Sequence, residues 1–520
     1  MKNKFLFLFL ISIFVFSRLY KISQIPSSVY WDEASIGYNA YSILKTGRDE
    51  WGEFMPLHFR AFGEFKLPVY IYSTVPFVHF FGLNEVSVRM PSFFYSLFSL
   101  LIIFALVKTV FESESLAFLS AFLFTVLPWD FIFSRTGYEA SCGLFFFLLS
   151  LLIWFLFKPF DLKIKRSFGK KILFLLVYLF SLIFSIYSYN SFRFWSPLSF
   201  VFLLTASLIK QIGNIKYKLI FSLISFLIIS FSFYPIYRLY KFDYGSSRFQ
   251  AVSLQGNFKE KTYSFVKNYL SHFSFDFLFL NGDSNLRSQM PGFGEIYVLS
   301  LPFIVLGFLY LLRRKDEFSS IIIFLLLISP IPASLTKESP HSLRSILLAF
   351  VFPVLISLGI YSFISVFGRQ KKFVLSIIVF SYLLFFGFYY SSFIRNYNNI
   401  SSSEWQYLYK EVFVNRREVV ERANKVIVSD SYGQPYIFAL FYNEFSPEEF
   451  RKTVRYNSPD KWGFSTVYSF DKFVFKKVDY QDLEKGSIIF SDEEILGKDN
   501  SLIDKIVSRD GKDLLFVYKI

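Results

Sequence analysis

The sequence predicts a polytopic α-helical membrane protein with a polar α/β domain at its C-terminal end. Of the 520 residues, 53% are hydrophobic and 74 are Phe, and the mean hydropathy is +0.42. A soluble domain does not carry this much apolar surface. Long apolar runs recur through residues 1–395, whereas residues 396–520 lack them. The two regions therefore predict a membrane domain and a separate extracytoplasmic domain.

We expect about eleven membrane-spanning helices, because the apolar runs approach the length needed to cross a bilayer. The first run follows Lys2 and Lys4 and lacks a small-residue cleavage site, so we interpret it as a retained helix. The runs lie near 4–20, 91–111, 116–134, 141–157, 172–189, 197–209, 219–237, 296–312, 318–333, 345–366 and 373–393.

The net charge of +15 is distributed in the manner of a membrane protein. Lys and Arg concentrate in short loops between apolar runs, which argues against a nucleic-acid partner and marks these loops as cytoplasmic. The loops are 158–171, 210–218, 313–317 and 367–372. They lie on the same side of the membrane as the N-terminal Lys residues only if residues 67–83 do not span. We therefore expect 67–83, which contains Pro68, Pro76 and His79, to be a juxtamembrane or re-entrant helix.

This topology places two long loops and the C-terminal domain outside the cytoplasm. The first external loop covers about 21–90, with juxtamembrane helices, and the second covers 238–295. The domain 396–520 is large enough to bury its own core. Its residue pattern predicts strands at 425–429, 487–490 and 514–520 and helices at 404–423 and 435–441.

The pair Asp32-Glu33 lies just past the first apolar run, within Tyr30-Trp31-Asp32-Glu33-Ala34. Carboxylates at the rim of a membrane segment are costly to desolvate, so they need partners or a function. Asp32 also precedes an expected helix, whose N-terminus favours the ionised form. Helix capping is the structural alternative. A second acidic pair, Asp49-Glu50, stands next to Trp51 and Gly52 and is interpreted as a solvated turn.

Charged residues from at least six loops gather at the external ends of the predicted spans. Carboxylates can accept a proton from an attacking hydroxyl, and cations can stabilise a departing phosphate. Interfacial anchoring is the alternative for the arginines, and a structural role is the alternative for His341. No phosphate-binding glycine loop occurs, so an activated group should arrive already energised on a lipid. The residues are Asp32, Glu33, Glu64, Lys66, Arg89, Arg135, Glu139, Arg193, Asp283, Arg287, His341 and Arg344.

Several short segments, taken in order, resemble the GT-C class of integral-membrane glycosyltransferases, specifically glycosyltransferase family 39. That family includes protein O-mannosyltransferases and the aminoarabinose transferase. The resemblance covers about residues 1–395. It is carried by Trp31-Asp32-Glu33, Gly63-Glu64-Phe65-Lys66-Leu67-Pro68, residues 82–92, 133–140 and 187–193, and the stretches 330–336 and 341–344.

The resemblance implies an inverting transfer of a sugar from a polyprenyl-phosphate donor to an acceptor hydroxyl. The reaction would take place on the extracytoplasmic face of the plasma membrane, with a lipid, glycan or protein as acceptor. No cofactor or metal is required, although a divalent cation is possible. Asp32 is implied as the catalytic base with Glu33 beside it. The resemblance places Lys66 and Arg89 at the donor phosphate. From their position at the external ends of the predicted spans, we add Arg135 and Arg344 as further phosphate contacts. On the same ground, we expect the substrates to contact Glu139, Arg193 and His341.

A flippase or transporter for lipid-linked sugars is the alternative function. Such a protein should place ionisable residues near the middle of the bilayer. Here they lie at the external ends of the predicted spans, which favours an enzyme.

Overall fold

The computed structural model describes residues 2–160, 167–209, 215–460, 464–479, 485–495, 501–509 and 511–520. Parts of two predicted cytoplasmic loops, 161–166 and 210–214, lie outside the described residues. The contacts divide the chain into two compact units. Unit 1 comprises Met1–Tyr20, Ser92–Lys241 and Phe249–Ser392, and unit 2 comprises Lys21–Pro91, Phe242–Arg248 and Phe393–Ile520. The predicted domain boundary at 395/396 stays a prediction.

Unit 1 is helical, and every apolar run predicted to span contains a helix. Some helices begin at a side-chain cap: Asp316, for example, accepts a hydrogen bond from the Ser319 N–H at 2.8 Å. The helices are α1 (Lys2–Leu19), α4 (Glu85–Phe111), α5 (Glu114–Val126), α6 (Glu139–Phe157), α7 (Phe168–Ile186), α8 (Phe192–Ile209), α9 (Ile215–Ser232), α10 (Tyr234–Phe242), α11 (Ser247–Val252), α12 (Phe258–Ser271), α13 (Leu301–Arg314), α14 (Glu317–Ile328), α15 (Ile331–Ser334), α16 (Leu348–Ser365) and α17 (Lys371–Ser401). Short π or 3₁₀ turns cover Asp276–Leu280, Val298–Ser300, Leu343–Ser345 and Gly368–Gln370. Helices α4, α10, α11 and α17 cross the boundaries between the units.

Eight helices among the described residues are long and apolar enough to cross a membrane, and two shorter apolar helices cover Phe5–Leu19 and Glu114–Val126. The prediction of a polytopic helical membrane protein is confirmed, whereas the number of eleven spans stays a prediction. Helix α3 (Pro68–Phe81) has 14 residues and falls within the segment expected not to span.

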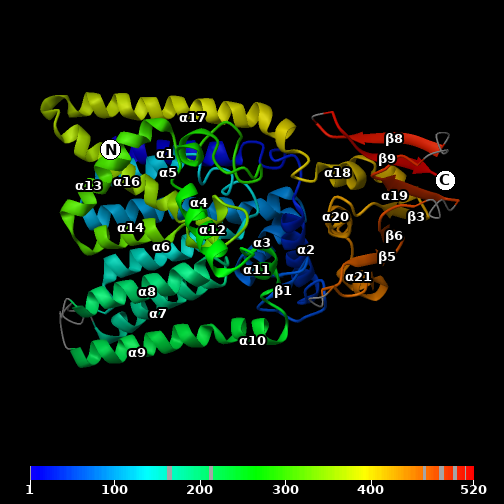
Figure 1. Ribbon diagram of the computed structural model, residues 1–520, viewed down its shortest axis with the longest axis horizontal. Helices are drawn as coiled ribbons and strands as arrows, with labels where there is room; N and C mark the ends of the chain where they lie inside the picture. Colours follow the sequence, from blue (N-terminus) through cyan, green and yellow to red (C-terminus); the bar gives the residue numbers. More distant parts are fainter. Residues whose placement is uncertain are drawn as a thin grey trace. The chain divides into compact units, whose positions relative to one another are not determined.

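The helices of unit 1 lie side by side in Figure 1, and α13 packs extensively against α16. A Cβ on Gly307 of α13 would lie 1.9 Å from the Leu355 carbonyl oxygen. A Cβ on Gly359 of α16 would lie 1.8 Å from the Phe303 carbonyl oxygen. Only glycine permits this backbone approach, which is typical of helices that pack in a membrane.

Unit 2 contains a seven-stranded mixed sheet in the order β4-β5-β6-β3-β7-β9-β8 (Figure 1). Strand β3 pairs in parallel with β6 and β7, and the outer pairs are antiparallel. The strands predicted at 425–429, 487–490 and 514–520 are confirmed. The sheet strands are β3 (Lys425–Val428), β4 (Arg455–Tyr456), β5 (Val467–Phe470), β6 (Phe473–Phe475), β7 (Ser487–Ser491), β8 (Leu502–Val507) and β9 (Asp513–Lys519).

In unit 2, α2 (Trp31–Thr46) packs against α3 and α20 (Pro435–Tyr442). Helix α20 confirms the prediction at 435–441. The single helix predicted over 404–423 is wrong, because a π-helical turn at Glu411–Asn415 separates α18 (Tyr407–Lys410) from α19 (Arg417–Arg422). Helix α21 (Pro447–Thr453) follows α20. A small hairpin joins β1 (Phe59–Arg60) to β2 (Phe65–Lys66).

Candidate active site

Asp32 lies in the first turn of α2, two residues after the Tyr30 N-cap position. Tyr30 offers no side-chain cap, so the helix start depends on its acidic residues and on more distant partners. A carboxylate in the first turn interacts favourably with the positive end of the helix dipole. The helix therefore stabilises Asp32 as an anion on an edge that stays partly open, since its side chain is 27% exposed.

Lys66 brings a cation to this carboxylate from the β1–β2 hairpin. Its Nζ lies 2.5 Å from Asp32 Oδ1 and 3.5 Å from Glu64 Oε1. The Lys66 side chain is only 4% exposed, so its aliphatic part is buried. Its ammonium group lies beside the Asp32 carboxylate. The structure thus joins two predicted site residues that are 34 positions apart in the sequence.

The hairpin is contacted by the first two residues of α11, which belong to unit 2. Arg248 Nε lies 3.3 Å from Glu64 Oε2, and the Ser247 hydroxyl donates to the Gly63 carbonyl oxygen at 2.8 Å. Glu64 is therefore placed between two cations, Lys66 and Arg248. This arrangement gives Lys66 two alternative carboxylate partners.

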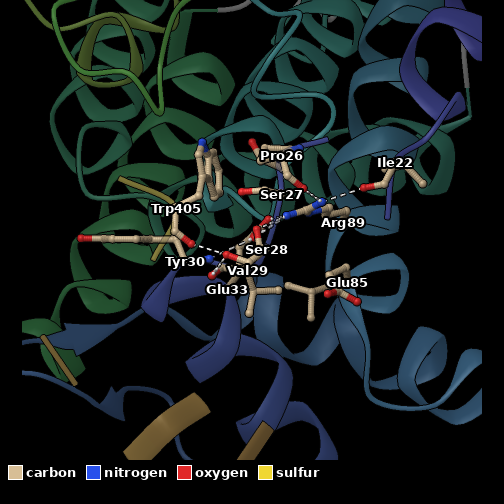
Figure 2. Close-up of polar contacts among 12 residues, drawn as sticks. Ile22, Pro26, Ser27, Ser28, Val29, Tyr30, Glu33, Glu85, Arg89 and Trp405 are labelled. Atoms are coloured by element: carbon tan, nitrogen blue, oxygen red, sulfur yellow. Dashed lines mark hydrogen bonds and ion pairs between the residues drawn. The ribbon is translucent and has the colours of Figure 1, made fainter. Parts of the chain in front are cut away.

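Glu33 turns away from this edge and pairs with Arg89 at the start of α4. Two parallel hydrogen bonds of 3.1 Å join Arg89 Nε and Nη2 to the Glu33 carboxylate. The remaining guanidinium donors reach the carbonyl oxygens of Ile22, Pro26 and Ser28 at 2.6–3.2 Å (Figure 2). Arg89 is fully buried and directs all five N–H groups at protein acceptors. These contacts favour a structural clamp over the phosphate contact expected from the sequence.

The interpretation of Asp49-Glu50 as a solvated turn is wrong. Both residues are 1% exposed. Asp49 Oδ1 accepts hydrogen bonds from the N–H groups of Trp51 at 3.0 Å and Glu53 at 2.8 Å. Burial raises the pKa of Asp49 to about 6. Burial, followed by the neighbouring Asp49 charge, raises the pKa of Glu50 to about 8.

The residues that cover this acidic pair come from the C-terminal part of unit 2. The Tyr456 ring stacks on Trp51 with centroids 4.8 Å apart, and Arg451 Nη1 donates to the Asp49 carbonyl oxygen at 3.1 Å. Neither Glu50 carboxylate oxygen has a hydrogen-bond partner among the described residues. The local sequence of the turn could not predict this burial, because Arg451 is 402 positions away from Asp49 in the chain.

Unit 1 holds the other predicted site residues. Arg135 donates to the carbonyl oxygens of Ser17, Arg18 and Tyr20 at 2.6–2.8 Å, so it caps the C-terminal end of α1. Arg193 donates to the Tyr240 hydroxyl at 3.0 Å.

Two further predicted residues of unit 1 have defined partners. Arg344 bonds the Thr336 hydroxyl at 2.9 Å and lies 3.2 Å from the Glu338 carboxylate. Glu139 begins α6. The substrate contacts predicted for Arg344, Glu139 and Arg193 stay predictions.

His341 belongs to a buried network in unit 1. Its Nδ1 lies 3.2 Å from Asp283 Oδ2, which also accepts from the Ser342 N–H and hydroxyl at 2.8 and 2.9 Å. Burial alone would raise the pKa of Asp283, but His341 and backbone N–H donors outweigh burial and lower it. Burial lowers the pKa of His272, which accepts the His341 N–H, to about 4.

In the part of the chain that the structure describes, no group of three or more His, Cys, Asp or Glu residues is arranged to hold a metal ion. The carboxylates at the start of α2 and in the hairpin instead pair with Lys or Arg, and Asp49 and Glu50 are buried. Whether the protein needs a divalent cation stays a prediction.

No protein-family model and no curated protein matches this sequence. Solved structures do match it. ArnT from Cupriavidus metallidurans in the apo state aligns over 99% of this chain and 98% of its own, with 10% identity and a TM-score of 0.61. The same enzyme bound to undecaprenyl phosphate aligns over the same shares, with 11% identity and a TM-score of 0.52.

The apo oligosaccharyltransferase from Archaeoglobus fulgidus aligns over 85% of this chain and 64% of its own, with 12% identity and a TM-score of 0.52. These neighbours are membrane glycosyltransferases of the GT-C class, so the GT-C fold expected from the sequence is confirmed. Membership of glycosyltransferase family 39 stays a prediction.

Proposed function

We propose that this protein is an inverting glycosyltransferase that moves a sugar from a polyprenyl-phosphate donor to an acceptor hydroxyl. The reaction would occur on the extracytoplasmic face of the plasma membrane. The observation that carries the proposal is the partly open Asp32–Lys66 pair, with its 2.5 Å contact at the start of α2. The shared fold with ArnT, which has been crystallised with undecaprenyl phosphate, supports a lipid phosphate as the donor carrier.

Lys66 would exchange its partner when the donor arrives. Its ammonium would leave Asp32 for the donor phosphate, helped by the second carboxylate partner at Glu64. As the C1–oxygen bond of the sugar breaks, the electron pair moves onto the phosphate oxygen. A positioned cation stabilises this growing charge, and one well-placed donor is worth roughly 10²–10³-fold in rate.

Asp32, released from Lys66, would then act as the general base. It would accept the acceptor hydroxyl proton while the acceptor oxygen bonds to C1 from the face opposite the phosphate. A single displacement inverts the configuration at C1 and releases polyprenyl phosphate. Glu33 and Arg89 would hold the helix start, and the lipid, glycan or protein nature of the acceptor stays open.

The test is a panel of radiolabelled polyprenyl-phosphate sugars incubated with the purified protein and a membrane extract as acceptor source. We expect the wild type to release polyprenyl phosphate and transfer the label, and Asp32→Asn to lose about 10²–10⁴-fold in rate with an unchanged Tm. Glu53→Gln is the matched control, because Glu53 is an exposed carboxylate in the same predicted external loop, residues 21–90. Wild-type turnover by Asp32→Asn would refute the base assignment. If the protein moves the intact donor lipid between the two leaflets and does not transfer its sugar, the alternative function as a transporter of lipid-linked sugars is favoured.

A further inference from the structure

The start of α2 is held by a side chain from the C-terminal part of unit 2. Trp31, the residue before Asp32, donates its backbone N–H to Gln406 Oε1 at 3.0 Å. Gln406 Nε2 in turn donates to the Tyr432 carbonyl oxygen at 2.8 Å, in the loop that follows β3. One amide therefore connects a first-turn N–H group, which has no partner inside its own helix, to the sheet domain.

Gln406 adopts an uncommon backbone conformation to make this bridge. Its φ of 51° and ψ of 40° lie in the left-handed region, which costs free energy for a residue other than glycine. The residue is 5% exposed, and both ends of its side-chain amide are used. A strained backbone persists where the surrounding contacts determine it, so this bridge is a defined feature of the fold.

The same loop touches Trp31 through Gly433. This glycine has a φ of 123°, and a Cβ there would lie 2.5 Å from Trp31 Cζ3 and 2.7 Å from Gln406 Nε2. Any larger residue would push against both the Trp31 ring and the bridging amide. The ring is bounded elsewhere by Phe62, with centroids 5.8 Å apart. Trp31 is thus fixed by its backbone and by its side chain.

We propose that Gln406, together with Gly433, is a positioning residue that sets the place of Asp32 relative to Lys66. Asp32 is bonded to Trp31, whereas Lys66 comes from a separate hairpin, so a shift of Trp31 changes their separation. This inference rests on the proposed function, in which Asp32 must reach the acceptor proton. Misplacement of a reacting group by about 1 Å can cost roughly 10²-fold in rate. The C-terminal domain would then take part in catalysis without touching the substrate.

Steady-state kinetics of the full-length Gln406→Ala and Gly433→Ala variants test this role, using whichever polyprenyl-phosphate sugar the wild type accepts. We expect kcat to fall about 10- to 100-fold while the donor KM stays within about twofold. Gln406→Glu keeps an acceptor for the Trp31 N–H and should recover part of kcat, whereas Gln406→Met should not. Gly486→Ala is the matched control, because Gly486 also has a positive φ of 86° but faces Asn424.

Hydrogen exchange of peptides covering the first turn of α2 gives a readout that needs no activity. We expect faster exchange there in Gln406→Ala and Gly433→Ala and wild-type exchange in Gly486→Ala. Unchanged exchange at the helix start overturns the positioning role, as does an equal loss of kcat in Gly486→Ala. If the variants exchange faster but the wild-type protein transfers no sugar, the proposed function is overturned. The Gln406 bridge is then a structural contact alone.

Discussion

Asp32 and Glu33 are neighbours in the sequence, but their ion pairs lie in opposite environments. The Glu33 and Arg89 side chains are 4% and 0% exposed, and every N–H of the guanidinium has an acceptor. Asp32 is 27% exposed and contacts Lys66 through one oxygen. The Lys66 ammonium also lies near Glu64, so it has two carboxylates with which it can pair.

Under the proposed function, this difference lets one short motif support two tasks. A buried ion pair with all its hydrogen bonds satisfied cannot exchange partners without leaving an uncompensated charge. A partly open pair can release its cation to a phosphate and its carboxylate to a hydroxyl. Rigid support on one side of α2 therefore makes partner exchange on the other side possible.

Removing the cation of the buried pair should have the largest effect. Arg89→Met leaves Glu33 buried without a partner, which costs about 3–5 kcal/mol in comparable cases. We expect a strong loss of folded protein, measured as yield and Tm in detergent. Arg248→Met, which removes an exposed partner of Glu64, is the control and should leave Tm nearly unchanged. An Arg89→Met protein with wild-type Tm would contradict the clamp.

Glu50 extends the comparison to a buried carboxyl that has no cation bonded to it. Its pKa of about 8 in the fold exceeds the ordinary value of 4.5, so the folded protein binds a proton that the unfolded chain releases between these pH values. Stability should therefore fall as the pH rises from about 4.5 to 8. Glu50→Gln should remove most of this dependence and stabilise the protein by about 4 kcal/mol at pH 8.

The measurement is Tm between pH 5 and 8. Asp49, with its pKa of about 6, should leave a smaller slope of the same sign in the Glu50→Gln variant. Glu53→Gln should keep the larger part of the slope, which comes from Glu50, because the Glu53 charge acts on the pKa of Asp49. A wild-type Tm that rises over this range would show that Glu50 is ionised in the fold.

Removing the cation of the open pair should have the smallest effect on stability and a selective effect on activity. Lys66→Ala should lower kcat/KM for the donor about 10²-fold, because the departing phosphate loses one positioned cation. The acceptor KM should change little. Lys45→Ala, at the exposed end of α2, is the control. A larger effect on the acceptor than on the donor would refute the phosphate role of Lys66.

Much of the fold could be predicted because its signals are local. Apolar runs identified the helical segments, and alternation of residue types identified β3, β7 and β9 in the C-terminal domain. The short strands β4, β5 and β6 were missed, since two to four residues carry little pattern, and the longer strand β8 was missed as well. The helix predicted over 404–423 failed because Gln406 and the π-helical turn are specified by contacts distant in sequence.

The candidate site likewise has some features that the sequence predicted and others that it did not. The motif placed Asp32 at a helix start and Lys66 before a proline, and both are features of a few consecutive residues. The sequence could not show that Arg135 caps α1, that Glu50 is buried, or that Gln406 bridges to Trp31. The Gln406–Trp31 bridge joins residues 375 positions apart.

By itself, the sequence determined that this chain is a helical membrane protein with an acidic pair at the start of a helix. Hydrophobicity and helix-start preferences act over a few turns, so they can be read along the chain. Only the tertiary structure decided which carboxylate became the buried clamp and which stayed open beside a lysine. Ion pairs are selected by distance in space and by burial, and both are set once the distant hairpin, helix and sheet have packed around α2.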